Sequence, residues 1–200
     1  MKKILPFICF VTSFLACTSS AKKEEKIKPS VYKNEEIGWE IEIPLGFNMI
    51  SQARIDANDK LGKEAIGKVY EGDVKVDSLR HLVSFNKNRF NLFDSTIEPY
   101  AEEKPGEYEA NNLLIKKLIF DTYNKQGIKI DTSSNKVEVS GQQFFAFYIK
   151  VYGPNGTPVL NQVMFNKPIK GFDFGVNITF NNAIDSALLI DAFKKSAFKK

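Results

Sequence analysis

The chain has 200 residues, of which 28 are basic and 24 acidic, giving a net charge of +4, and 43% are hydrophobic. This near balance of charge, without a basic stripe, argues against a nucleic-acid partner, because binding to phosphates requires clustered cations. His81 is the only histidine, and Cys9 and Cys17 are the only cysteines, so zinc sites built from several such ligands are excluded.

At the N-terminus, Lys2 and Lys3 precede an apolar run at 4–16, and Cys17 follows the small residue Ala16. This pattern resembles the signal peptide and lipobox of bacterial lipoproteins. The run has 13 residues, whereas a membrane-spanning helix needs about 20, and it suits the apolar region of a signal peptide. We therefore expect cleavage before Cys17, its acylation with palmitate, and residence in the bacterial cell envelope, at the outer membrane or the periplasmic face. An ordinary secretory signal cut elsewhere is the alternative.

The remaining chain divides into two parts. Residues 17–31 are mostly polar and charged, and we expect a flexible tether because such a segment cannot bury enough apolar surface to fold. Removal of residues 1–16 would leave 26 basic and 24 acidic residues and a single cysteine, so a disulfide within the mature chain is excluded. Residues 32–200 have a suitable length for a single α+β domain.

The first half of this domain predicts mainly strands. Trp39, Ile41 and Ile43 alternate with polar residues, which is typical of a strand with one buried face. The expected elements are this strand, a turn at 44–47, a strand at 48–51 that pairs back on it, a weak helix at 52–69, and strands at 79–85 and 89–97.

The segment after Pro105 predicts a helix from Glu107 to Lys125. Gly127 fits the position just past its end, where a left-handed backbone conformation is common. The side chains expected to face the core from this helix are Leu114, Ile115, Leu118, Ile119 and Tyr123.

The last third of the chain has the clearest periodicity. The expected elements are strands at 128–130, 137–139, 142–152, 159–165 and 172–180, and a helix at 183–196. The strand at 142–152 is apolar on both faces and therefore lies inside a sheet. Asn182 can cap the last helix through its side chain. The side chains expected to point inward from that helix are Ile184, Leu188, Leu189, Ala192 and Phe193.

Strands joined by hairpins, with helices between groups of them, predict an α+β fold with an antiparallel β-sheet flanked by helices on both faces. Three features resemble the PsbP-like family: the segment 43–47 after the first strand, the turn at 153–156, and the end of the last helix at 196–198. The resemblance covers residues 32–198. It implies a fold used mainly for protein binding, and it transfers no catalytic motif to this chain.

No residue pattern predicts a catalytic site, a cofactor or a metal. His81 is expected to be a structural residue at a strand edge. Residues 56–62 resemble a calcium loop, but Lys60 and Leu61 stand where an acidic ligand and a glycine are needed. The acidic residues at 98–109 are expected to form a solvated loop and helix start.

The sequence therefore predicts a non-enzymatic, lipid-anchored envelope protein that acts as a protein-binding or accessory module. Its expected partners are the membrane, through lipid on Cys17, and a protein of unknown identity. Two alternatives remain, an envelope hydrolase that uses carboxylates or His81, and a carrier of an apolar ligand, which the 17 phenylalanines favour. An exposed apolar patch, a polar pocket with paired acids, or a large internal void, respectively, would distinguish the three.

Overall fold

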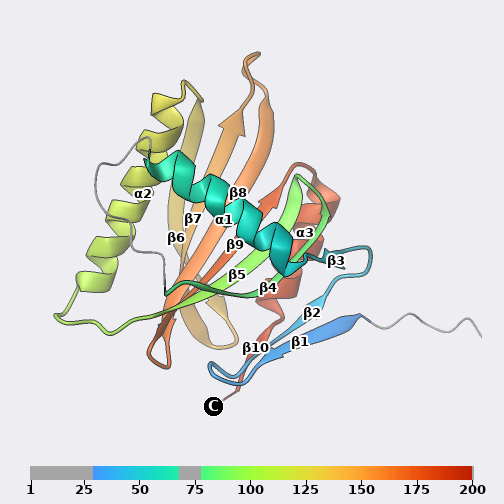
Figure 1. The fold of residues 1–200 in the computed structure, drawn as a ribbon, viewed down its shortest axis with the longest axis vertical. Helices are drawn as coiled ribbons and strands as arrows, with labels where there is room; N and C mark the ends of the chain where they lie inside the picture. Colours follow the sequence, from blue (N-terminus) through green and yellow to red (C-terminus); the bar gives the residue numbers. More distant parts are fainter. Residues whose placement is uncertain (1–28, 68–77, 200) are drawn as a thin grey trace, which may run out of the picture.

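The computed structural model describes residues 29–67 and 78–199, with the backbone alone over 62–67 (Figure 1). The predicted signal peptide and Cys17 lie outside these residues. The strands are β1 (Ser30–Asn34), β2 (Trp39–Ile43), β3 (Asn48–Met49), β4 (Arg80–Asn88), β5 (Asn91–Pro99), β6 (Ile130–Val139), β7 (Gln142–Tyr152), β8 (Pro158–Ile169), β9 (Phe172–Phe180) and β10 (Ala197–Phe198). The helices are α1 (Gln52–Gly67), α2 (Glu107–Lys125) and α3 (Ala183–Lys194).

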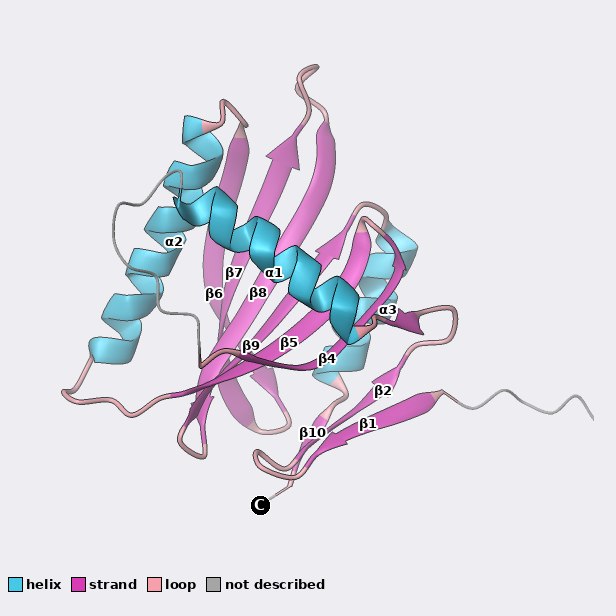
Figure 2. Ribbon diagram, in the orientation of Figure 1, coloured by secondary structure: helices cyan, strands magenta, loops and turns pink. Residues whose placement is uncertain are grey.

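The strands form two antiparallel sheets, with helices on both faces of the larger one. Seven strands form the large sheet in the order β3-β4-β5-β9-β8-β7-β6, and three form the small sheet in the order β1-β2-β10. Figure 2 shows α1 crossing one face of the large sheet, the face on which α2 also lies, while α3 lies on the other face. This confirms the predicted α+β architecture.

The main core lies between the large sheet and a layer made of α3 and the small sheet. Trp39 of β2 is almost fully buried there, and its ring lies 4.9 Å from Phe174 and 6.3 Å from Phe93, centroid to centroid. Its indole N–H donates a hydrogen bond to the hydroxyl of Ser196 at 3.0 Å. Trp39 therefore packs the small sheet against the large one, together with Ile41 and Ile43 of the same strand.

A second, smaller apolar cluster lies on the opposite face of the large sheet, beneath α2. Phe147, Ile149 and Val151 of β7 pack there against Ile119 and Tyr123. Strand β7 is thus covered on both faces, as its sequence predicts.

Several predicted elements are confirmed in their bounds. The helix Glu107–Lys125 and the strands Gln142–Tyr152 and Phe172–Phe180 form as expected. Asn182 caps α3, since its side-chain oxygen accepts a hydrogen bond from the backbone N–H of Asp185 at 2.9 Å. Local periodicity and capping chemistry are sufficient to define these segments.

Two predictions about the strands were wrong, one about pairing and one about length. Strand β3 pairs with β4 and not with β2, because Phe47 enters the core against Phe85 and leads the chain to the large sheet. Residues 128–139 were expected to hold two short strands around a turn, yet 130–139 form the continuous strand β6. Every residue of β6 is paired with β7, and this pairing keeps its polar residues extended at the sheet edge.

The end of the last helix was also predicted incorrectly. Helix α3 ends at Lys194, and Ser196 turns inward to accept the hydrogen bond from Trp39. The two residues Ala197 and Phe198 then pair with β2 as strand β10. The chain end is therefore part of the small sheet.

The predicted inward face of α2 is confirmed only in part: Ile119 and Tyr123 pack against the sheet, but the first half of the helix differs. Leu114 is 65% exposed and Ile115 is also exposed, whereas the buried residues are Tyr108 and Asn112. The sheet beneath this end of α2 is polar, and the Tyr108 hydroxyl donates to a carboxylate oxygen of Asp173 at 2.7 Å. Polar side chains face inward because the sheet supplies hydrogen-bond partners for them.

Candidate functional site

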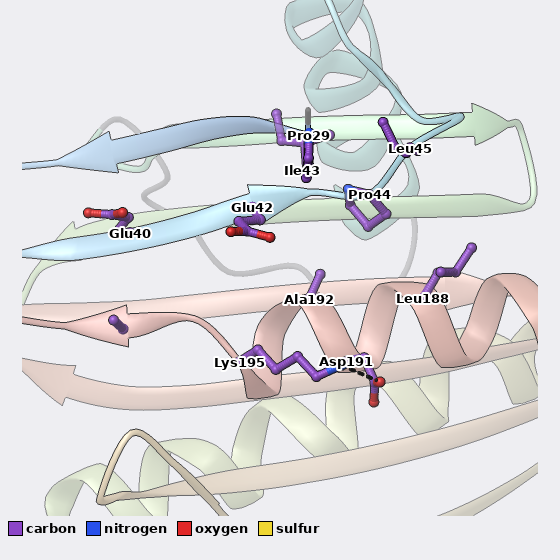
Figure 3. A pocket seen from close by; sticks show the side chains of 11 residues that line it. Pro29, Glu40, Glu42, Ile43, Pro44, Leu45, Leu188, Asp191, Ala192 and Lys195 are labelled. Atoms are coloured by element: carbon purple, nitrogen blue, oxygen red, sulfur yellow. Dashed lines mark hydrogen bonds and ion pairs between the residues drawn. The ribbon is translucent and has the colours of Figure 1, made fainter. Parts of the chain in front are cut away.

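A surface groove runs between β2 and α3, beside the main core (Figure 3). Its volume is about 580 Å³. The lining residues are Pro29, Glu40, Glu42, Ile43, Pro44, Leu45, Leu188, Asp191, Ala192, Lys195 and Ala197. Strand β2 and the turn after it form one wall, and α3 with the start of β10 forms the other.

The α3 wall carries apolar side chains that the core does not use. Leu189 and Phe193 are fully buried, as predicted, but Ile184 is 74% exposed and Leu188 is 40% exposed, contrary to the prediction that they face inward. Helix α3 has apolar residues around most of its circumference, but only one side of it packs against the core. Apolar residues on its other sides therefore remain exposed. Leu188 lines the groove with Ala192, and Ile184 lies one turn earlier on the same side.

The β2 wall carries a further exposed apolar residue. The turn after β2 is closed by a hydrogen bond from the Phe47 N–H to the Pro44 oxygen at 3.1 Å. Phe47 enters the core, while Leu45 at the tip of the turn is 56% exposed. Leu45 and Leu188 therefore present apolar surface from opposite walls of the same groove (Figure 3).

The charges along the groove are only partly paired. Glu40 is bonded to Lys199 at 2.9 Å, and this ammonium lowers the pKa of the Glu40 carboxyl. Asp191 and Lys195 form an ion pair within α3 at 2.9 Å. The Glu42 carboxylate has no hydrogen bond or ion pair with any residue that the structure describes. Within that part of the chain, its negative charge on the rim of the groove is thus unpaired.

A second cavity, of about 250 Å³, lies between α2 and the opposite face of the large sheet. Its polar lining consists of Asp94, Thr96, Glu98, Asn112, Lys116, Asn166, Asp173 and Asn177. Burial raises the pKa of the Asp173 carboxyl, which accepts the hydrogen bond from Tyr108. Asn166 donates to Asn112 across the cavity wall. The remaining lining is mostly apolar and comes from Leu79, Ile115, Phe147, Met164, Phe165 and Val176. The volume lies below the range of about 300–1,000 Å³ that is usual for ligand pockets, so this cavity is not the large internal void that the carrier interpretation requires.

His81 lies in β4 between two carboxylates. Its Nδ1 is 2.9 Å from an oxygen of Asp94, and its Nε2 is 3.1 Å from both oxygens of Asp59 in α1. The Ser84 hydroxyl donates to Asp94 and not to His81. This arrangement lacks the bond between nucleophile and base that a serine hydrolase needs, and it favours a structural role in which His81 holds α1 to the sheet.

The stability of the protein is expected to depend on the charge of His81. The hydrogen bond with Asp94 is the main cause that raises the pKa of His81. The stabilisation is therefore fully present below the unfolded pKa of about 6.5 and is lost as the pH rises through the higher folded pKa. Urea titrations should show the free energy of unfolding falling across this interval, by about 1.4 kcal/mol per unit of pKa difference.

The variant His81→Gln provides the control for this prediction. It keeps a polar side chain but cannot gain a proton, so the fall in stability between the two pKa values should disappear. Identical pH profiles for the wild type and the variant would contradict the assigned role of His81.

The other residues considered in the sequence analysis do not assemble into a site. Residues 56–62 belong to helix α1 and form no calcium loop. Glu102 accepts a hydrogen bond from the Gly106 N–H at 2.9 Å and so organises the start of α2. Within 29–61 and 78–199, no three His, Cys, Asp or Glu side chains gather as metal ligands would. None of the described helices combines the length and apolar character needed to cross a membrane.

Sequence reasoning did not identify the groove. Its residues come from segments far apart in the chain, and only the fold brings Leu45 and Leu188 to one place. One signal was present, because α3 has more apolar residues than a single buried side of a helix can use.

Comparisons with known proteins identify the fold. The solution structure of cyanobacterial PsbP (CyanoP) from Synechocystis sp. PCC 6803 matches with a TM-score of 0.57 at 13% identity, covering 88% of this chain and 96% of that one. A crystal structure from Bacteroides thetaiotaomicron VPI-5482 has a TM-score of 0.46 at 8% identity, covering 87% of this chain and 50% of that one. No family model and no curated protein matches the sequence.

Proposed function

Given its PsbP-like fold, we propose that the protein is a non-enzymatic, lipid-anchored accessory module of a bacterial cell envelope that binds another protein. Lipid on Cys17 is the proposed anchor, supported by the N-terminal sequence pattern. The groove between β2 and α3 is the proposed binding surface.

The observation that carries this proposal is the exposed apolar surface of the groove. Leu45, Ile184 and Leu188 are all exposed, although large apolar side chains gain free energy from burial. Complete burial of one such side chain against a partner contributes about 1.5–3 kcal/mol. An apolar surface of this kind, bordered by charged residues, is typical of a site for a protein partner.

Two further observations support a binding role over hydrolysis. Both ring nitrogens of His81 are engaged by carboxylates, so neither is positioned to take a proton from a nucleophile. In the groove, Asp191 forms an ion pair with Lys195. None of the carboxylic acids that line the groove is buried, so Glu42 has no buried acid beside it. Neither place presents the pair of perturbed acids that glycoside hydrolysis uses. The cavity under α2 does contain the carboxyl groups of Asp94, Glu98 and Asp173, but the first is bonded to His81 and the last to the Tyr108 hydroxyl.

Site-specific photo-crosslinking in the native envelope tests the proposal. A photoreactive residue at position 45, on the rim of the groove, should capture one defined protein. The same probe at position 114, equally exposed on α2 but on the other side of the large sheet, should not capture it.

A charge placed in the groove is expected to abolish this capture. In Leu188→Glu a carboxylate would be buried against the partner without a counter-ion, and we expect capture from position 45 to fall roughly tenfold or more. Leu114→Glu adds the same charge on α2 and should leave the capture unchanged. Mass spectrometry of the crosslinked product measures both.

Three results would contradict the proposal: equal capture from positions 45 and 114, no capture from either, or capture that is insensitive to Leu188→Glu. Turnover of an envelope polymer by the purified protein, lost in His81→Gln, would favour the hydrolase instead.

A further inference from the structure

Strand β2 has a free backbone edge inside the groove. On the side away from β1, it pairs with β10 only at Trp39 and Glu40. No other strand among the described residues pairs with that side. From residue 41 to Ile43, the edge faces α3 across the groove (Figure 3).

The direction of the backbone groups follows from the strand period. The Lys199 N–H donates to the Gly38 oxygen at 2.7 Å, so the N–H at the other end of that peptide bond, on Trp39, points away from β10 and toward β1. Successive residues of a strand face opposite ways, and Glu42 therefore points its N–H and C=O toward the groove. If β10 extended further, Lys195 would lie opposite Glu42, but its N–H donates to the Asp191 oxygen in the last turn of α3. On the groove side, Glu42 is thus left without a strand partner among the described residues.

We infer that the groove takes up an extended segment of the partner protein, which adds to β2 as a short antiparallel strand in line with β10. An open strand edge is a template for such pairing, and the two backbone groups of Glu42 supply one donor and one acceptor. This inference rests on the proposed function and specifies the kind of segment that the partner contributes.

The groove also specifies the side chains of that segment. In an antiparallel pair, directly opposite residues lie on the same face of the sheet, so the residue opposite Glu42 lies beside its unpaired carboxylate. A lysine or arginine there complements the charge. The preceding residue of the segment lies opposite Ile43 and points to the other face, and Leu188 and Ala192 line the groove beside it. The position opposite residue 41 is next to Ala197 and is held by the buried Ser196. The segment therefore carries the pattern apolar–basic.

Immobilised peptides with a central valine–lysine sequence are the probe, and the detergent-solubilised full chain is the analyte. We expect the peptide to retain the protein. Retention should fall roughly tenfold when the lysine amide is N-methylated, because this removes the donor to the Glu42 oxygen without changing any side chain. A valine–glutamate peptide should also fail to retain it, since two carboxylates would then meet.

Three variants at position 42 separate the backbone contribution from the charge. Glu42→Pro removes the N–H that faces the groove and leaves the hydrogen bonds with β1, so binding should fall roughly tenfold. Glu42→Ala keeps the N–H and should lose only roughly threefold. Glu42→Lys should reverse the preference toward the glutamate peptide. Thermal unfolding confirms that each variant is folded, and the reversal by Glu42→Lys does not depend on how the proline variant folds.

The inference is overturned if the plain peptide is not retained, if N-methylation has no effect, or if a folded Glu42→Pro binds as the wild type does. If photo-crosslinking from position 45 in the native envelope still captures the partner in Glu42→Pro, the proposed function stands and strand addition is refuted. If the wild type captures no partner from position 45, the proposed function itself is refuted.

Discussion

Replacing Cys17 with serine is expected to move the protein from the membrane fraction to the soluble fraction of the envelope. Each buried methylene of an acyl chain contributes about 0.8 kcal/mol, and a lasting anchor needs two or more chains. Serine cannot take the thioether-linked lipid, so the anchor is lost entirely. Membrane flotation measures the distribution, and mass spectrometry of the N-terminal peptide identifies the modification.

The lysines that follow Cys17 provide the control for this experiment. Lys22→Ala combined with Lys23→Ala keeps the acylation site but removes two cations, each worth about 1 kcal/mol near an anionic membrane surface. This double variant should stay with the membrane. Membrane retention of Cys17→Ser, or an uncleaved chain with a free thiol at position 17, would contradict the proposed anchor.

Replacing Trp39 with alanine is expected to lower the free energy of unfolding by about 3–5 kcal/mol. The loss is large because the ring contacts Phe93 and Phe174 in the large sheet and Phe198 in β10. Since a domain is typically stable by about 5–15 kcal/mol, this single change removes a major part of the total. Urea unfolding followed by circular dichroism measures the difference.

A milder variant separates ring packing from hydrogen bonding. Trp39→Phe retains an aromatic ring but loses the indole N–H, which leaves the buried Ser196 hydroxyl without its donor. We expect a loss of about 1–3 kcal/mol, smaller than that of the alanine variant. A loss below about 1 kcal/mol in Trp39→Ala would show that the two sheets are held together by other contacts.

The alternation of apolar and polar residues correctly predicted elements that have one face in the core and the other outside it. Strand β9 is the clearest case, since Phe174, Val176 and Ile178 are buried in the core while the residues between them face the other side. Asn182 likewise marked the start of α3, because its capping bond needs only the residues that follow it. Both signals act over a few residues and are therefore readable without the fold.

Long-range pairing and the orientation of helices could not be read in this way. The pairing of β3 with β4 depends on the packing of Phe47 against Phe85, which is 38 positions further along the chain. The first half of α2 turns polar residues inward because Asp173 and Asn166 lie under it, and their positions are fixed by β8 and β9. An apolar face alone does not determine which side of a helix is buried when the sheet beneath it is polar.

The groove between β2 and α3 could not be predicted from the sequence. It depends on where β10 begins, and that depends on Ser196 turning inward to Trp39 at the end of α3. The exposed Ile184 and Leu188 indicated a surplus of apolar residues but not what lies opposite them. The open edge of β2 has no sequence signature of its own, because it results from a two-residue strand that begins only at Ala197.

The position of Pro29 limits where a partner can be met. Pro29 lines the groove, and β1 begins at the next residue. Cys17 precedes Pro29 by 12 residues, and a fully extended chain of that length spans at most about 40 Å. With lipid on Cys17, the groove stays within roughly one bilayer thickness of the headgroups. Only proteins that sit in the same membrane, or lie close along its surface, would then come within reach.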